Sequence, residues 1–144
     1  CVTQYEEIKE ALLNTNINVV MNNNSSLGIS SSIKLGINFD KDADGYMFMV
    51  CDQPFISIES LNSVIDNFIN GDKGIVCAGY GKNKGNPVIF SKRYINELLS
   101  LEGDSGGKKI VKGHLNDLKI VNVNNEIELL DIDTQEEFGK VTHI

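Results

Sequence analysis

The sequence has no long apolar run and little positive charge. Its 144 residues contain no stretch that approaches the roughly 18 to 20 apolar residues needed to cross a bilayer. Its 13 Lys and Arg residues are outnumbered by 20 Asp and Glu residues, which gives a net charge of −7. A negative surplus disfavours binding to nucleic acid or to an anionic membrane, because both carry negative charge themselves. We therefore expect neither as a partner.

Cysteine is also scarce. Cys1, Cys51 and Cys77 form an odd set without C-x-x-C spacing, which argues against a disulfide framework and against a zinc site. Cys51 and Cys77 stand in apolar stretches, where a cysteine is typically a small buried hydrophobe. The set predicts reduced thiols in a cytoplasmic protein.

The composition is that of a folded protein. Hydrophobic residues make up 41% of the chain and charged residues 23%. The length suits one domain with a proper core and is too short for two ordinary ones, so we expect a single domain over residues 1–144. The chain opens with Cys1 directly in a helical pattern, without a signal or transit pattern. We expect it to be the C-terminal portion of a longer domain.

The central stretch is the apolar run at residues 46–51, which ends in Asp52. Five to six apolar residues between Gly45 and Pro54 predict a strand buried on both faces, as in a parallel sheet. Asp52 would then lie at the carboxyl end of the strand, where open α/β sheets bind their ligands. A carboxylate without a neighbouring Lys or Arg in sequence is a natural ligand for Mg²⁺. The alternative is that Asp52 only caps the helix starting near Ser57.

Helical and strand patterns alternate along the rest of the chain. Ser30–Ser32 precede an apolar helical pattern and resemble hydroxyl caps, at a helix N-terminus that could hold an anion. A merely well-capped helix is the alternative. Residues 79–87 combine glycines with Lys82 and Lys84, which predicts either a ligand-binding loop or an exposed hairpin loop. Further strands are expected at residues 17–21, 74–79, 88–90, 118–123 and 126–130, and further helices at residues 5–13 and after Ser57, Ser91, Lys108 and Thr134. Ser57 is the expected N-cap of its helix, and Thr134 and Glu137 have the spacing of a capping box. The alternation predicts a mostly parallel sheet with helices on both faces.

Asp131 and Asp133 form a second acidic element. Because they are two residues apart in an extended pattern, both side chains should point to the same side. If this segment lies near Asp52, two carboxylates can share one Mg²⁺ and leave positions for phosphate oxygens and water. That arrangement suits phosphoryl or nucleotidyl transfer, which needs no nucleophilic side chain. His114 and His143 are interpreted as surface histidines.

Five segments, taken in order, resemble one family. Residues 51–54 resemble its G-D-Q-P segment, and residues 22–36 its N-x(4)-E-G-[ML]-x-x-S-[LI]-x-x-G stretch. Residues 85–90 resemble G-x-P-V-L-F, residues 103–108 resemble G-D-x-G-A-R, and residues 131–134 resemble the start of D-I-D-T-P-E-D. The family is that of the molybdenum cofactor cytidylyltransferases and related MobA-like nucleotidyltransferases.

The resemblance implies a three-layer α/β/α Rossmann-like nucleotidyltransferase fold with a mostly parallel sheet. The implied reaction joins CTP to the phosphate of molybdopterin and releases pyrophosphate, with Mg²⁺ as cofactor and a molybdoenzyme as a possible recipient of the product. Asp52 and Asp133 are the implied catalytic residues, and Asp52, Asp131 and Asp133 the implied metal ligands, with Asp133 favoured over Asp131. The residues implied to contact the nucleotide or the pterin are Gly28, Ser31, Ser32, Gln53, Pro54, Gly85, Pro87, Gly103, Asp104 and Gly106.

The sequence also departs from the family pattern. The family begins with L-A-A-G-x-S-x-R-M-G-x-x-K, a glycine-rich loop that cradles the triphosphate, and nothing here matches it. We expect the chain to lack the first strand–loop–helix unit and to be inactive by itself. Smaller departures are Cys51 for Gly, Gly107 for Ala, Lys108 for Arg and Gln135 for Pro. A guanylyl- or sugar-nucleotidyltransferase of the same fold, or a non-catalytic accessory domain that binds the molybdenum cofactor, are the alternatives.

Overall fold

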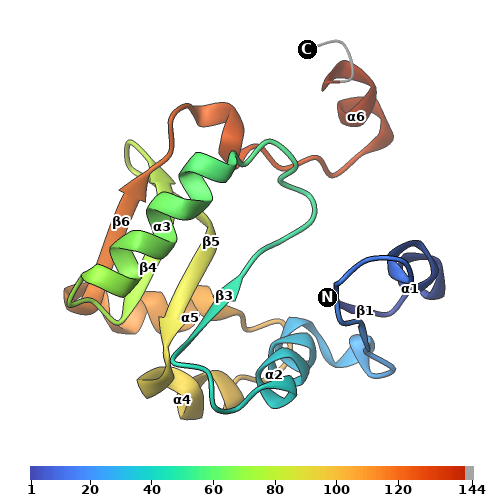
Figure 1. Ribbon diagram of the computed structural model, residues 1–144, viewed down its shortest axis with the longest axis horizontal. Helices are drawn as coiled ribbons and strands as arrows, with labels where there is room; N and C mark the ends of the chain where they lie inside the picture. Colours follow the sequence, from blue (N-terminus) through green and yellow to red (C-terminus); the bar gives the residue numbers. More distant parts are fainter. Residues whose placement is uncertain (142–144) are drawn as a thin grey trace. The chain divides into compact units, whose positions relative to one another are not determined.

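The computed structural model describes residues 1–141, which form two compact units (Figure 1). The first unit combines Cys1–Tyr46 with Ser91–Leu115. The second combines Met47–Phe90 with the chain from Asn116 onward. Each unit is therefore built from two stretches that are separated in sequence, and each is described by itself below.

The first unit contains a small parallel sheet and several helices. Strand β1 (Val2–Thr3) pairs with β2 (Val20–Met21), with Val2 opposite Val20. The helices are α1 (Glu6–Leu12), α2 (Ile29–Phe39), α4 (Ile95–Leu99) and α5 (Gly107–Gly113), with 3₁₀ helices at Ser25–Leu27 and Lys92–Tyr94. Helices α2 and α4 pack together, and their buried side chains include Ile33, Ile37 and Leu98.

The second unit is organised around a four-stranded sheet. Its order is β3 (Gly45–Phe48), β5 (Asn83–Ser91), β4 (Ile75–Tyr80) and β6 (Leu118–Asn122). Strand β4 runs parallel to β6 and antiparallel to β5, which places Ile75 opposite both Leu118 and Phe90. The parallel pairs β1–β2 and β4–β6 agree with the expected mostly parallel α/β architecture.

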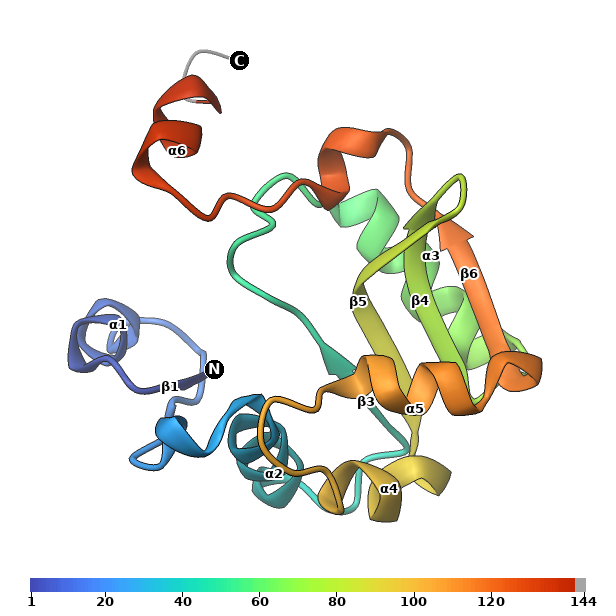
Figure 2. The same cartoon turned by 180° about the vertical axis from the view of Figure 1, so that it is seen from behind.

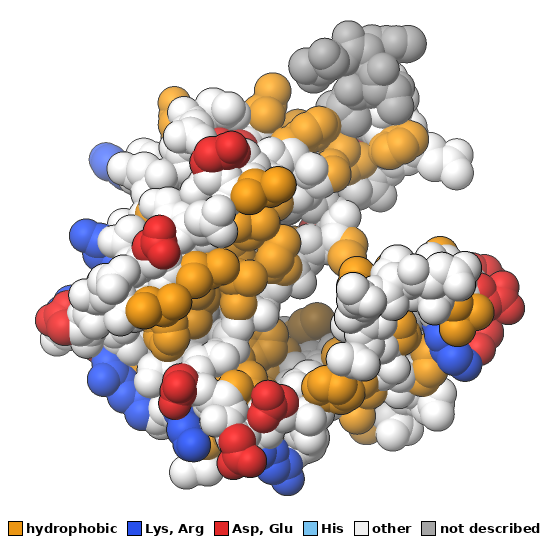
Figure 3. Space-filling view, viewed as in Figure 1, with side chains coloured by type: hydrophobic (Ala, Val, Ile, Leu, Met, Phe, Trp, Pro, Cys, Tyr) orange, Lys and Arg blue, Asp and Glu red, His pale blue; other side chains and the backbone are white. Residues whose placement is uncertain are grey.

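Helix α3 (Ile58–Asn70) covers one face of this sheet and packs against β4 and β6 (Figures 1 and 2). Strand β4 is buried from Ile75 to Gly79, as expected for a strand with a neighbour on each side. The core between helix and sheet consists of Val64, Val76, Ala78, Ile89, Val121 and Val123. Each end of the helix keeps an apolar side chain in solvent, Ile58 at one end and Ile69 at the other. Figure 3 shows a band of hydrophobic side chains on the face of the molecule that it draws.

Two helix starts follow the predicted capping chemistry. Ser57 is the N-cap of α3, and its Oγ accepts a hydrogen bond from the Ser60 N–H at 3.1 Å. Helix α6 (Gln135–Val141) begins with a capping box, in which the Thr134 N–H donates to Glu137 and the Glu137 N–H donates to the Thr134 Oγ. Both caps were predicted from residue spacing alone and are confirmed.

The predicted central strand is shorter and more exposed than expected. Strand β3 ends at Phe48 and lies at the edge of the sheet, so it has a neighbour on one side only. Met49 is 46% exposed, and Asp52 lies in a turn beyond the strand. The prediction of a strand that is buried on both faces and reaches Cys51 is therefore wrong.

Three further predictions need correction. Helix α2 begins at Ile29 with Gly28 as its N-cap, so Ser30–Ser32 lie inside its first turns and do not cap it. The late strand expected at residues 126–130 is a 3₁₀ helix, Glu126–Leu129. The strand expected at residues 17–21 is limited to Val20–Met21. Within residues 1–141, no helix is both long and apolar enough to cross a bilayer.

Val64 and Ile69 lie on the same helix and test the importance of its buried face. Val64 is 0% exposed and Ile69 is 70% exposed. Val64→Ala should lower the free energy of unfolding by about 2 kcal/mol, because it removes two buried methyl groups and leaves a cavity. Ile69→Ala should change it by less than about 0.5 kcal/mol. Urea denaturation of both variants measures the difference, and equal effects would contradict the assigned packing.

Candidate active site

Two segments far apart in sequence meet in the second unit. The Ile132 N–H donates to the Asp52 carbonyl oxygen at 2.8 Å. The buried Gln53 amide donates from Nε2 to Asp131 Oδ1 at 2.7 Å and to the Leu129 carbonyl oxygen at 3.3 Å. Both partners of this nitrogen can only accept, which fixes the orientation of the amide. The turn at Asp52 and the acidic segment at residues 131–133 are thus in direct contact.

The carboxylates at this junction differ in what they bind. Asp131 gives one oxygen to Gln53, whereas the side chains of Asp52 and Asp133 are exposed and contact no other described residue through a hydrogen bond or ion pair. The backbone of Asp133 is held by Glu137 Oε2, which accepts its N–H at 3.0 Å. Two carboxylates therefore stand on anchored backbone with their oxygens open to solvent.

These two carboxylates fit a hard divalent cation. Among the described residues, no group of three or more His, Cys, Asp or Glu side chains is arranged as a metal site. Mg²⁺ does not require such a group, because it is commonly bound by one or two carboxylates and takes its other ligands from water and substrate phosphates. Asp52, Asp131 and Asp133 supply carboxylates of that kind at this junction.

Glu128 is a buried carboxylate beside this junction that the sequence analysis missed. It is 2% exposed, and its Oε2 accepts from the Ser57 N–H at 2.9 Å and from the Ser57 Oγ at 2.8 Å. Its Oε1 accepts from the Asn124 N–H at 3.0 Å. Burial by itself would raise the pKa of Glu128, but these bonds and the nearby Ser60 hydroxyl, which lacks full hydrogen-bond geometry, hold the pKa below its usual value.

Glu128 therefore ties the 3₁₀ helix Glu126–Leu129 to the start of α3. The turn at Asp52 leads into α3, and the acidic segment follows the 3₁₀ helix. The hydrogen bonds of Glu128 therefore fix the position of the element next to the turn and of the element next to the acidic segment. No local sequence pattern indicates this role, because all the donors except Asn124 lie about seventy residues away in the chain.

A second cluster of predicted residues lies in the first unit. The Ser30 N–H donates to the Gly103 carbonyl oxygen at 3.1 Å, which joins the start of α2 to the loop before α5. Gly28 has a φ of +87°, and a Cβ there would lie 2.3 Å from the Gly103 carbonyl carbon and 2.6 Å from Asp104 Oδ1. Only glycine fits this approach. The structure thus brings Gly28, Gly103 and Asp104 together.

Asn22 organises the hydroxyls beside this contact. It is 3% exposed, and its Nδ2 donates to Ser31 Oγ at 2.8 Å and to Ser32 Oγ at 2.9 Å. The Ser31 Oγ donates in turn to the Gly28 carbonyl oxygen at 2.8 Å. The sequence analysis included Asn22 in a motif but gave it no role.

The remaining predicted residues lie in varied settings. Gly85 and Pro87 belong to β5, and residues 79–87 form a hairpin, one of the two predicted alternatives, with a tight turn in which Tyr80 pairs with Asn83. A Cβ on Gly85 would lie 3.1 Å from the Leu129 side chain, and the Pro87 side chain is fully buried. Gly106 is the N-cap of α5, and Pro54 is exposed in the turn after Asp52.

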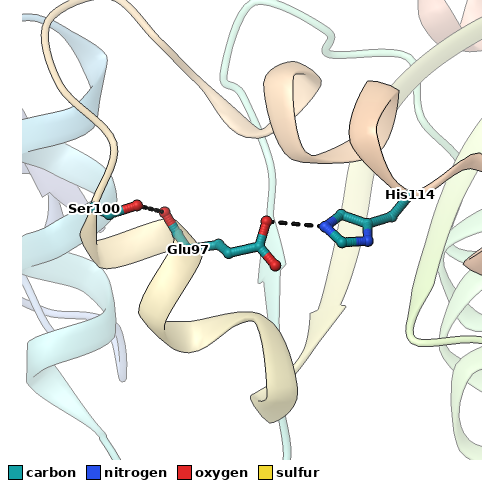
Figure 4. Close-up of polar contacts among 3 residues, drawn as sticks. All are labelled: Glu97, Ser100 and His114. Carbon is teal, nitrogen blue, oxygen red and sulfur yellow. Dashed lines mark hydrogen bonds and ion pairs between the residues drawn. The ribbon is translucent and has the colours of Figure 1, made fainter.

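His114 is paired rather than simply exposed (Figure 4). Its Nε2 lies 2.9 Å from Glu97 Oε2, and its ring meets the Tyr94 ring edge-on with centroids 4.8 Å apart. Glu97 belongs to α4 and His114 is the C-cap of α5, so the contact links these two helices. His143 lies outside the described residues.

Comparisons with known proteins place the chain among nucleotidyltransferases. Residues 1–118 match the MobA-like NTP transferase domain. The purine catabolism protein PucB of Bacillus subtilis is 28% identical over 100 residues, which are 69% of this chain and 47% of PucB. The chain therefore spans about half the length of this curated relative.

Solved structures agree in fold. The manganese complex of Rv0371c from Mycobacterium tuberculosis H37Rv has a TM-score of 0.78 at 23% identity, over 96% of this chain and 72% of that one. A nucleotidyl transferase from Methanothermobacter has a TM-score of 0.77 at 22% identity, and the similarity covers 94% of this chain and 66% of that one. These similarities confirm the predicted α/β nucleotidyltransferase fold.

Removing the charge of Glu128 should destabilise the protein in a pH-dependent way. Because the folded-state pKa is lowered, this carboxylate stabilises the protein above its unfolded pKa, roughly 4.3, and the stabilisation is lost as the pH falls through the folded pKa. Glu128→Gln should cost about 2 kcal/mol at pH 7, and the gap to wild type should narrow below about pH 4. Urea unfolding from pH 3 to 7 measures this, with the exposed Glu126→Gln as control. A gap that does not vary with pH would contradict the assignment.

Proposed function

The chain belongs to the MobA-like NTP transferase family, and on that premise we propose that the complete protein transfers CMP from CTP to the phosphate of molybdopterin and releases pyrophosphate. The observation that carries the proposal is the contact between the turn at Asp52 and the segment Asp131–Asp133, in which the carboxylates of Asp52 and Asp133 have no hydrogen-bond partner among the described residues. Five ordered segments that resemble the cytidylyltransferases support the choice of substrates.

In this proposal Asp52 and Asp133 are the catalytic residues and hold a divalent cation, Mg²⁺. Asp131 helps to position the segment through Gln53 and offers its second oxygen as a further ligand. The bound ion would neutralise phosphate charge and orient the reacting phosphate. The manganese in the Rv0371c complex supports a divalent cation in this family.

The remaining predicted residues bind the substrates. Gly28, Ser31 and Ser32 contact the nucleotide, and the Ser32 hydroxyl, whose proton no described residue accepts, supplies a hydrogen bond. By the resemblance, Gly103, Asp104 and Gly106 of the first unit are assigned to molybdopterin binding, and so are Gly85 and Pro87 of the second unit. Gln53 and Pro54 shape the turn that carries Asp52. A molybdoenzyme that receives the product is the expected protein partner, and a cytoplasmic location remains a prediction from the cysteines.

Asp52 is the residue on which the proposed chemistry depends most. Asp52→Asn in the complete protein should lower kcat by about 100-fold or more, because an amide is a much poorer ligand for a hard cation than a carboxylate. Asp133→Asn should lower kcat more than Asp131→Asn does, because one oxygen of Asp131 already accepts a hydrogen bond from Gln53. Pyrophosphate release measures all three, with the exposed Asp72→Asn as the charge-matched control. Wild-type kcat in Asp52→Asn would refute the role.

A panel of the four nucleoside triphosphates tests the choice of nucleotide. With molybdopterin and Mg²⁺, we expect kcat/KM for CTP to exceed that for GTP, ATP and UTP by at least about tenfold, which corresponds to about 1.4 kcal/mol of discrimination. A preference for GTP would replace the cytidylyl assignment with a guanylyl one. Transfer to a sugar phosphate but not to molybdopterin would favour a sugar-nucleotidyltransferase. Binding of molybdopterin without transfer from any triphosphate would favour the accessory domain.

A further inference from the structure

We propose that Asn22 is a positioning residue that makes the Ser32 hydroxyl a committed hydrogen-bond donor toward the nucleotide. The inference rests on the proposed function, in which Ser32 contacts the nucleotide. It goes further by assigning a role to Asn22 and by stating the chemistry of the ligand atom opposite Ser32. That atom is an acceptor, an oxygen or an unprotonated nitrogen.

The orientation of the Asn22 amide follows from its neighbours. The Asn24 N–H lies 3.0 Å from Asn22 Oδ1, and a backbone N–H can only donate. The oxygen of the amide must therefore face Asn24, and its two N–H bonds must face the two serine hydroxyls at 2.8 and 2.9 Å. All three contacts would be disrupted if the amide turned over.

The backbone of Asn22 is held as well. Its N–H donates to the Thr3 carbonyl oxygen at 2.7 Å, directly after β2. The side chain is 3% exposed, so water cannot easily replace its partners. A buried amide with every polar group paired is costly to rearrange, and the orientation of its hydrogen bonds should persist when a ligand binds.

The two serine hydroxyls then differ in what they can still do. Each has one proton and accepts one N–H from Asn22. Ser31 donates its proton to the Gly28 carbonyl oxygen. Ser32 is half-buried, and no described residue accepts its proton. Of the pair, Ser32 is the one whose proton remains available to a ligand.

This arrangement gives the site a preference that a freely rotating hydroxyl lacks. A hydroxyl without fixed neighbours can turn either its proton or a lone pair toward a ligand. Asn22 already donates to one lone pair of Ser32, so the O–H is directed away from the amide and its proton is the group that lacks a partner among the described residues. A ligand acceptor would pair that proton, whereas a ligand donor, such as an amino group, would bind the second lone pair and leave the proton unpaired.

The variant that tests the inference is Asn22→Asp, which keeps the shape and reverses the hydrogen bonding. Carboxylate oxygens only accept, so both serine protons should turn toward position 22 and Ser32 should present lone pairs to the ligand. Calorimetry on the complete protein should show the Kd for CTP raised about tenfold, the size expected for one lost hydrogen bond. Ser32→Ala should raise it by a similar factor.

The double variant separates positioning from general damage. If Asn22 acts through Ser32, then Asn22→Asp combined with Ser32→Ala should bind CTP no more weakly than Ser32→Ala alone. Multiplication of the two effects would overturn the inference, as would wild-type affinity in either single variant. Ser32→Ala leaves the Asn22 side chain in place, so wild-type affinity in that variant overturns the inference even if Asn22→Asp folds poorly in a thermal melt.

Two further measurements complete the design. Asn23→Asp adds the same charge at the neighbouring exposed residue and should leave the Kd within about twofold of wild type; a tenfold rise there would attribute the effect to charge and overturn the inference. Turnover is measured separately from binding. Wild-type protein that binds CTP but transfers nothing would refute the proposed function and leave the Asn22 comparison valid, whereas absence of binding to all four triphosphates would refute both.

Discussion

The hydrogen bonds of the Glu128 carboxylate are the constraint on which the second unit's acidic site depends. A buried carboxylate needs partners for its oxygens, and here they come from the N-cap of α3 and from the backbone of Asn124. Satisfying that need joins the 3₁₀ helix Glu126–Leu129 to α3. The turn at Asp52 and the segment at Asp131 extend from these two elements, and Gln53 completes the connection between them.

Each of the two units contains a buried side-chain amide that positions residues assigned to ligand binding. In each, polar side chains assigned to ligand binding need a fixed orientation: those of the turn at Asp52 in the second unit, and Ser31 and Ser32 in the first turns of α2 in the first unit. In each, a buried amide provides the support by donating to groups from a different part of the chain: Gln53 in the second unit and Asn22 in the first. A buried amide whose N–H groups are paired favours one arrangement of a site, because other arrangements leave those groups without partners.

How much could be predicted from the sequence depended on the range of the interactions involved. Helix α3, its Ser57 cap, the capping box at Thr134 and the buried strand β4 follow from local spacing, and all were predicted. The end of β3 was not, because an apolar run does not reveal whether its strand lies at the edge of a sheet. The 3₁₀ helix at Glu126–Leu129 was taken for a strand because four residues carry too little periodicity to separate the two. Glu128 was missed, and so were the positioning roles of Gln53 and Asn22, because the partners of these side chains are defined by the tertiary fold.

The way the chain divides between the two units has a consequence for how it can fold. Residues 1–46 find their partners at residues 91–115, and residues 47–90 find theirs after residue 115. Contacts of such long sequence separation require large loops to close before they contribute any stability, which slows folding. During synthesis, neither unit can be completed until the chain beyond Phe90 has emerged. Until then, the first half of the chain exposes apolar surface that is buried in the folded protein. During this period the chain can bind chaperones or aggregate.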